Sequence, residues 1–84
     1  MCATEYIKDR AQEIERAAQD KINIIDDVLA GLLSLTARAE ALPRAGGLLV
    51  LLLRMQAEFV EEKAAALRVI ESALELRRNT KEVL

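Results

Sequence analysis

Apolar residues are unevenly spread along this chain and gather in two runs on either side of a single proline. The first run covers residues 22–35 and the second covers residues 48–60, with Pro43 between them. Outside these runs the sequence is rich in charged residues that favour helices. The pattern predicts two helical arms joined by a bend, with the most apolar part of each arm beside the bend.

The first arm has helical periodicity from about residue 4 to residue 41. A second apolar set joins from residue 22 onward, at Ile24, Val28 and Leu35, and widens the apolar face. Apolar residues at steps of three and four lie on one face of an α-helix. The recurring residues are Ile7, Ala11, Ile14, Ala18, Ile22, Ile25, Leu29 and Leu32.

The bend is predicted at residues 42–47, where Pro43 precedes two glycines. Proline disfavours the helical conformation at the residue before it and is well tolerated at the first position of a new helix. The second arm is expected from residue 48 to about residue 80, and it opens with the uninterrupted apolar run 48–53. A helix that is apolar on every side is buried on every side.

A six-residue apolar run is also compatible with a buried strand. No second strand is available to pair with it, and leucine forms helices more readily than strands. A chain of 84 residues makes one small domain. We therefore predict an all-α fold in which residues 1–84 form a single antiparallel helical hairpin with coiled-coil packing.

The two arms are nearly equal in length, so a symmetrical fold about the bend would place residue i opposite residue 85 minus i. This register matches apolar residues with apolar residues along the whole hairpin. The expected pairs are Leu35 with Val50, Leu32 with Leu53, Ile25 with Val60, Ala18 with Leu67, Ile14 with Ile70 and Ala11 with Leu74.

Two helices bury only the stripe between them, so side chains such as Ile24 and Leu51 should point elsewhere. Exposed apolar patches mark interfaces, and each fully buried Leu or Ile contributes roughly 1.5–3 kcal/mol. We expect two hairpins to form a four-helix bundle, with the bend-proximal halves in contact. The expected self-association residues are Val28, Leu32, Leu35, Leu48, Leu49, Leu51 and Leu52.

The composition excludes several kinds of chemistry. Hydrophobic residues make up 52% of the chain but aromatic residues only 2%, which favours helix packing over an aromatic pocket. There is no histidine and only one cysteine, Cys2, which excludes histidine-based catalysis, an intramolecular disulfide and cysteine-based zinc sites. We expect no enzymatic activity, no catalytic residue, no cofactor and no metal.

An acidic group is the best candidate for chemistry, because clustered carboxylates can hold Mg²⁺ or Mn²⁺. In the expected register Asp26 and Asp27 lie opposite Glu58, with Glu61 and Glu62 one turn further. Glu58-x-x-Glu61 resembles half of the paired Glu-x-x-Glu and Glu-x-x-Asp helices of some helical nucleotide pyrophosphohydrolases, but no Glu-x-x-Asp follows. We interpret the group as a solvated acidic face, and metal binding by Asp26, Asp27, Glu58 and Glu61 stays open.

Basic residues lie near the open ends of both arms. The expected architecture resembles in shape the plasmid copy-number proteins of the Rop type, helical-hairpin dimers that bind structured RNA. Acidic residues interleave with the bases here and the net charge is −2, so a phosphate-binding surface is not favoured. The bases are Lys8, Arg10 and Arg16 on the first arm and Arg68, Arg77, Arg78 and Lys81 on the second.

Location and function follow from these patterns as hypotheses. No secretory signal is visible, and the run 48–53 is far short of the ~20 apolar residues that span a bilayer. We expect a cytoplasmic, homodimeric interaction protein that binds an unidentified protein target as a regulator, inhibitor or adaptor, without a membrane or nucleic-acid partner. The alternatives are a structural subunit whose hairpins stack into a larger assembly and a Rop-like RNA-binding hairpin.

Overall fold

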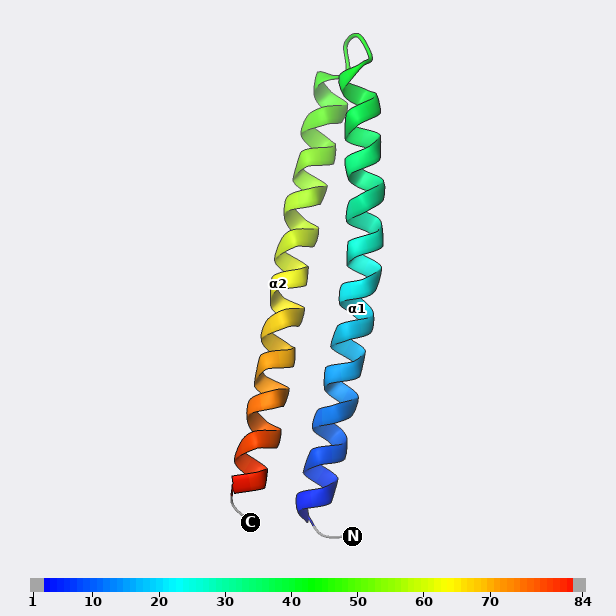
Figure 1. Cartoon of the computed structure of the whole chain (residues 1–84). Helices are drawn as coiled ribbons and strands as arrows, with labels where there is room; N and C mark the ends of the chain where they lie inside the picture. Colours follow the sequence, from blue (N-terminus) through cyan, green and yellow to red (C-terminus); the bar gives the residue numbers. More distant parts are fainter. Residues whose placement is uncertain (1–2, 83–84) are drawn as a thin grey trace.

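The chain forms two long α-helices that pack side by side. The computed structural model describes residues 3–82, with helix α1 spanning Ala3–Glu40 and helix α2 spanning Gly46–Glu82. The helices are antiparallel, so both ends of the chain lie at the same end of the molecule (Figure 1). The result is a rod of 64 × 14 × 12 Å. The predicted all-α antiparallel helical hairpin is confirmed.

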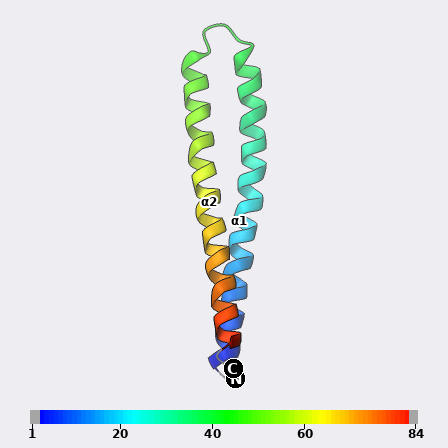
Figure 2. The same ribbon diagram turned by 60° about the vertical axis from the view of Figure 1, so that its left-hand side comes forward.

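The two helices wind around one another along the rod. In Figure 1 the ribbons nearly overlap beside the bend and separate toward the open end, whereas the turned view in Figure 2 shows the opposite. Contacting residues recur at alternating steps of three and four, an average of about 3.5 residues, which favours left-handed winding. We call these contacting positions the seam. They are Lys8, Ala11, Glu15, Ala18, Ile22, Ile25, Leu29, Leu32, Thr36 and Ala39 on α1, and Leu49, Leu52, Gln56, Phe59, Lys63, Ala66, Ile70, Ala73, Arg77 and Thr80 on α2.

The seam is thin, because small and polar side chains occupy much of it. Five of the buried residues are alanines, and the large buried side chains among the described residues are Ile22, Ile25, Leu32 and Leu52. The main hydrophobic cluster lies beside the bend, where Leu32 and Leu52 pack with Ala39 and the half-buried Phe59. The hairpin alone therefore buries few of its leucines.

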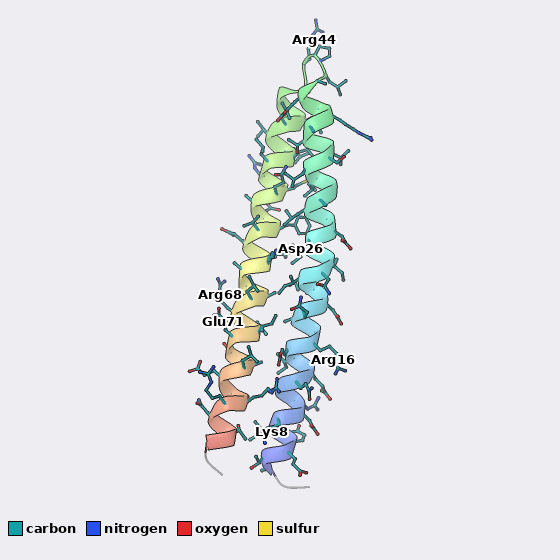
Figure 3. All side chains as sticks on the ribbon, viewed as in Figure 1. Lys8, Arg16, Asp26, Arg44, Arg68 and Glu71 are labelled. Atoms are coloured by element: carbon teal, nitrogen blue, oxygen red, sulfur yellow. The ribbon has the colours of Figure 1, made fainter. Side chains whose placement is uncertain are left out.

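The bend spans residues 41–45. The backbone N–H of Ala41 donates to the carbonyl oxygen of Arg38 at 3.2 Å, and the N–H of Leu42 donates to that of Ala39 at 3.1 Å. Arg44 adopts a left-handed φ of 61°, and it lies at the tip of the molecule in Figure 3. Helix α2 begins at Gly46, two residues before the predicted start, so both glycines belong to its first turn.

The predicted register is wrong. The numbers of the bonded residues add up to 92 for Thr36 with Gln56 and for Glu15 with Arg77, rather than to 85. Each predicted pair contains at least one exposed residue; the exposed members are Ile14, Leu35, Val50, Leu53, Val60, Leu67 and Leu74.

The error has a physical cause on each helix. A helical side chain leans toward the N-terminus of its own helix, so in an antiparallel pair the residues that touch lie further along the chain than those at the same level. On α1 the predicted apolar face was also one residue off at the open end. There the polar Lys8 and Glu15 occupy the seam, and the predicted Ile7 and Ile14 are exposed.

Candidate interaction surfaces

More large apolar side chains lie on the surface of the hairpin than inside it. Among the described residues, sixteen are exposed, with exposed fractions of 36–63%, whereas four are buried. Contiguous exposed apolar surface is uncommon on monomeric proteins and marks sites of interaction. These residues are the candidate functional surface, and all but Tyr6 and Leu33 fall on one of two faces beside the seam.

The larger face consists of residues that each directly precede a seam position. One residue along a helix is a rotation of about 100°, so these side chains lie to one side of the seam. In an antiparallel hairpin that side is shared by both helices. We call this surface the groove face. Its apolar members are Ile7, Ile14, Ala17, Ile24, Val28, Leu35 and, in the bend, Leu42, together with Leu48, Leu51, Met55, Ala65, Val69 and Leu76 of α2.

Depressions run along the groove face because the seam beneath it is rich in alanine. Toward the open end, Ile14 of α1 and Val69 of α2 border two adjoining depressions of about 370 and 350 Å³. The floors of these two depressions are formed by Ala11, Ala18, Ala66 and Ala73. A third depression of about 150 Å³ lies beside the bend, between Leu35 and Leu48. Such hollows can accept leucine or isoleucine side chains from another helix.

The charges within the groove face differ in sign between the two helices. On α1 the charged members are Arg10, Lys21 and Arg38, and on α2 they are Glu58 and Glu62. A second hairpin that places its α2 against α1 would therefore bring carboxylates toward basic side chains.

A second apolar surface lies mainly on α2. Residues that directly follow a seam position form a line along this helix, rotated from the seam in the opposite direction. The equivalent positions on α1 include the polar Gln12, Gln19 and Asp26, with the exposed Leu33 closer to the bend. We call the line on α2 the outer stripe. Its members are Val50, Leu53, Ala57, Val60, Ala64, Leu67 and Leu74.

The residues expected to mediate self-association do not share one environment. Leu32 and Leu52 are buried in the hairpin's own cluster, against which Val28 and Leu49 are half-buried. The exposed members of the set lie on the groove face, and these are Leu35, Leu48 and Leu51.

The acidic residues do not converge. Asp26 accepts a hydrogen bond from the Nζ of Lys63 at 2.6 Å, and thus contacts a base of α2 rather than the expected Glu58. Glu58, Glu61 and Glu62 are exposed on α2. Within residues 3–82, no group of three or more possible ligands is placed to hold a metal ion.

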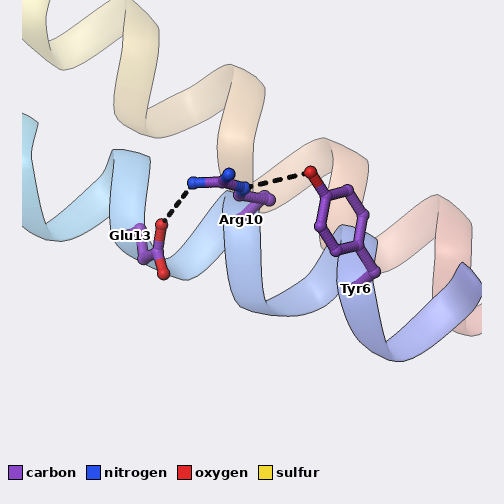
Figure 4. Close-up of polar contacts among 3 residues, drawn as sticks. All are labelled: Tyr6, Arg10 and Glu13. Atoms are coloured by element: carbon purple, nitrogen blue, oxygen red, sulfur yellow. Dashed lines mark hydrogen bonds and ion pairs between the residues drawn. The ribbon is translucent and has the colours of Figure 1, made fainter. Parts of the chain in front are cut away.

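The basic residues at the open end are partly engaged by acids and do not form one face. Arg77 Nη1 donates to Glu15 Oε2 at 2.7 Å across the seam. Arg10 donates hydrogen bonds to the Tyr6 hydroxyl at 3.2 Å and to Glu13 at 3.0 Å (Figure 4). Both bonds raise the pKa of Arg10, the bond to Tyr6 more than the bond to Glu13. Figure 3 shows Arg16 and Arg68 on opposite outer sides of the hairpin.

Comparisons with protein-family models, curated proteins and solved structures find no match for this chain. Neither helix, over the part of the chain that the structure describes, contains a segment long and apolar enough to cross a lipid bilayer. Function is therefore inferred from the two apolar surfaces.

Proposed function

We propose that this protein is a protein–protein interaction module that forms a homodimer through the groove face. One observation carries the proposal: this face holds nine of the sixteen exposed large apolar side chains. The depressions beside Ile14 and beside Leu35 provide matching hollows for the side chains of a second copy. Two hairpins packed in this way form a four-helix bundle, the common arrangement for such helices.

The burial available is sufficient for association. Each exposed leucine, isoleucine or valine on the groove face is about half covered already, so full burial contributes about 1 kcal/mol per side chain. Nine such side chains from each protomer are enough to offset the loss of free motion on association, ~4–15 kcal/mol. The orientation of the two hairpins would be set by ion pairs between the basic groove-face residues of α1 and the second copy's Glu58 and Glu62; the basic residues are Arg10, Lys21 and Arg38.

As a dimer, the module would bind a further protein as a regulator, inhibitor or adaptor. Its cytoplasmic location and its lack of enzymatic activity stay predictions from the sequence. The outer stripe favours one alternative, a structural subunit, because it leaves a second apolar surface free for assembly. The pairing of Arg77 with Glu15 and of Arg10 with Glu13 does not favour the RNA-binding alternative, since it reduces the charge offered to phosphates.

The test is sedimentation equilibrium over a dilution series, comparing the wild type with Leu35→Glu and Ser34→Glu. Both variants add one carboxylate at neighbouring exposed positions, but only Leu35 lies on the groove face. We expect Leu35→Glu to lose the tightest association step while circular dichroism still reports helix, and Ser34→Glu to associate as the wild type does. Equal association of all three proteins would contradict the proposal.

A further inference from the structure

A row of alternating charges borders the outer stripe of α2. Arg54, Glu61, Arg68 and Glu75 follow one another at intervals of seven residues, and all four are exposed. Each directly follows a large member of the outer stripe. Seven residues are close to two helical turns, so the row runs parallel to the stripe along one edge of the helix.

We propose that the outer stripe binds the α2 helix of a second copy of this chain in antiparallel orientation. A two-fold axis that crosses α2 between residues 64 and 65 places Arg54 opposite Glu75 of the second copy and Glu61 opposite Arg68. Every charge of the row then faces one of opposite sign, giving four ion pairs. A parallel alignment would instead place each charge opposite the same residue of the second copy, which has the same sign.

The apolar side chains fit the same alignment. Ala57 and Ala64 come close to Leu74 and Leu67 of the second copy, so small residues lie against large ones. The stripe is interrupted at Glu71, which occupies a stripe position and would lie near Val60 of the second copy. Figure 3 shows Arg68 and Glu71 on the side of α2 that faces away from α1, where a second helix has free access.

The geometry of α2 allows it to contact α1 through the seam and a second copy through the outer stripe at once. The outer stripe is displaced from the seam by one residue, which is a rotation of about 100° around the helix. Adjacent contacts in a square four-helix bundle lie about 90° apart. This pairing is independent of the groove face, which lies on the other side of the seam. With five large side chains per copy against nine, it is the weaker of the two contacts.

Charge-row variants test the alignment. In a Leu35→Glu background, which removes the groove-face contact, one variant carries Arg54→Glu and Arg68→Glu and the other carries Glu61→Arg and Glu75→Arg. We expect each alone to associate roughly tenfold or more weakly than the Leu35→Glu parent, and an equimolar mixture to recover association as a heterodimer. Undiminished association of either variant alone, or a mixture of helical proteins that fails to recover, would overturn the proposal.

Cysteine cross-linking tests it in a protein that keeps both surfaces intact. In a Cys2→Ser background, the proposed axis brings Ala64→Cys within about 2 Å of its copy along the helix axis, whereas Ala57→Cys lies ~22 Å from its copy along the same direction. Mild oxidation should yield a disulfide-linked dimer of the first variant at least tenfold faster than of the second. Equal rates, or faster linkage of Ala57→Cys, would exclude the antiparallel alignment. Because neither readout needs the groove-face dimer, failure of this proposal is distinguishable from failure of the proposed function.

Discussion

The hydrogen bond between Thr36 and Gln56 offers a direct test of how the two helices hold their register. Thr36 is the one buried polar residue among those described, with 8% of its surface exposed. Its Oγ1 donates to the carbonyl oxygen of Leu32 at 2.7 Å and accepts from Gln56 Nε2 at 2.7 Å. Thr36→Val removes both functions while keeping the shape, and Gln56→Leu removes the donor from the other helix.

The expected magnitudes follow from the contacts that each change removes and adds. Thr36→Val loses the bond from Gln56, worth about 0.5–1.5 kcal/mol net, and gains about 0.8 kcal/mol from a buried methyl group. Gln56→Leu loses the same bond and gains apolar burial at a half-buried position. Because the bond can be lost only once, the double variant should be more stable than the sum of the two single changes by about 1 kcal/mol.

Urea unfolding followed by circular dichroism gives the four free energies of unfolding. All four proteins are compared at one concentration, because self-association adds to apparent stability by mass action. Additive effects, with a coupling below about 0.3 kcal/mol, would refute the role assigned to this bond. The double variant also loses a contact that distinguishes registers, so a second set of amide resonances from a slipped hairpin is expected in its NMR spectrum.

Three further changes have defined outcomes. Arg44→Gly should raise the free energy of unfolding by about 0.5–1 kcal/mol in urea titrations, because φ is 61° there, whereas the control Arg44→Ala should bring no gain. Gly31→Ala should stabilise the helix by about 1 kcal/mol, since a Cβ there would meet nothing within 4 Å. If the variant is destabilised in concentrated samples but not in dilute ones, residue 31 makes a close contact with a second copy at the groove face. Leu52→Ala, at a position with 6% exposure, should lower the free energy of unfolding by about 2–4 kcal/mol at every protein concentration. Leu51→Ala, at a position with 52% exposure, should lower it by less than about 1 kcal/mol in dilute samples and by more in concentrated ones. Equal losses for the two leucines would contradict the packing described.

The hairpin itself was predictable from the sequence. The apolar periodicity, the abundance of strong helix formers and the single Pro43 near the middle leave few alternatives to two helices and a bend. The helix bounds differ from the predicted ones by at most two residues. The difference at the start of α2 arises because both glycines that we assigned to the bend fit its first turn.

The packing of the helices was less predictable, because apolar residues occur on several sides of α2. Neighbouring residues differ by about 100°, so Leu51 and Leu52 face different surroundings although their chemistry is the same. Small and polar side chains such as Ala73 and Gln56 occupy the seam, and counting large apolar residues does not find them. The signal in the sequence that distinguishes these surfaces is an interval of seven residues. It groups Leu53 with Val60, Leu67 and Leu74 in one line along α2, and it separates this line from the seam.

The alanine-rich seam has a consequence for how the fold depends on the amount of protein. In the proposed dimer, another copy removes much of the apolar surface of each copy from water, so the free energy of folding contains a term that grows with concentration. Dilution would then loosen the helices themselves as well as separate the copies. In a cell, such a chain would gain resistance to proteolysis as it accumulates, and its abundance would act as a threshold for its own persistence.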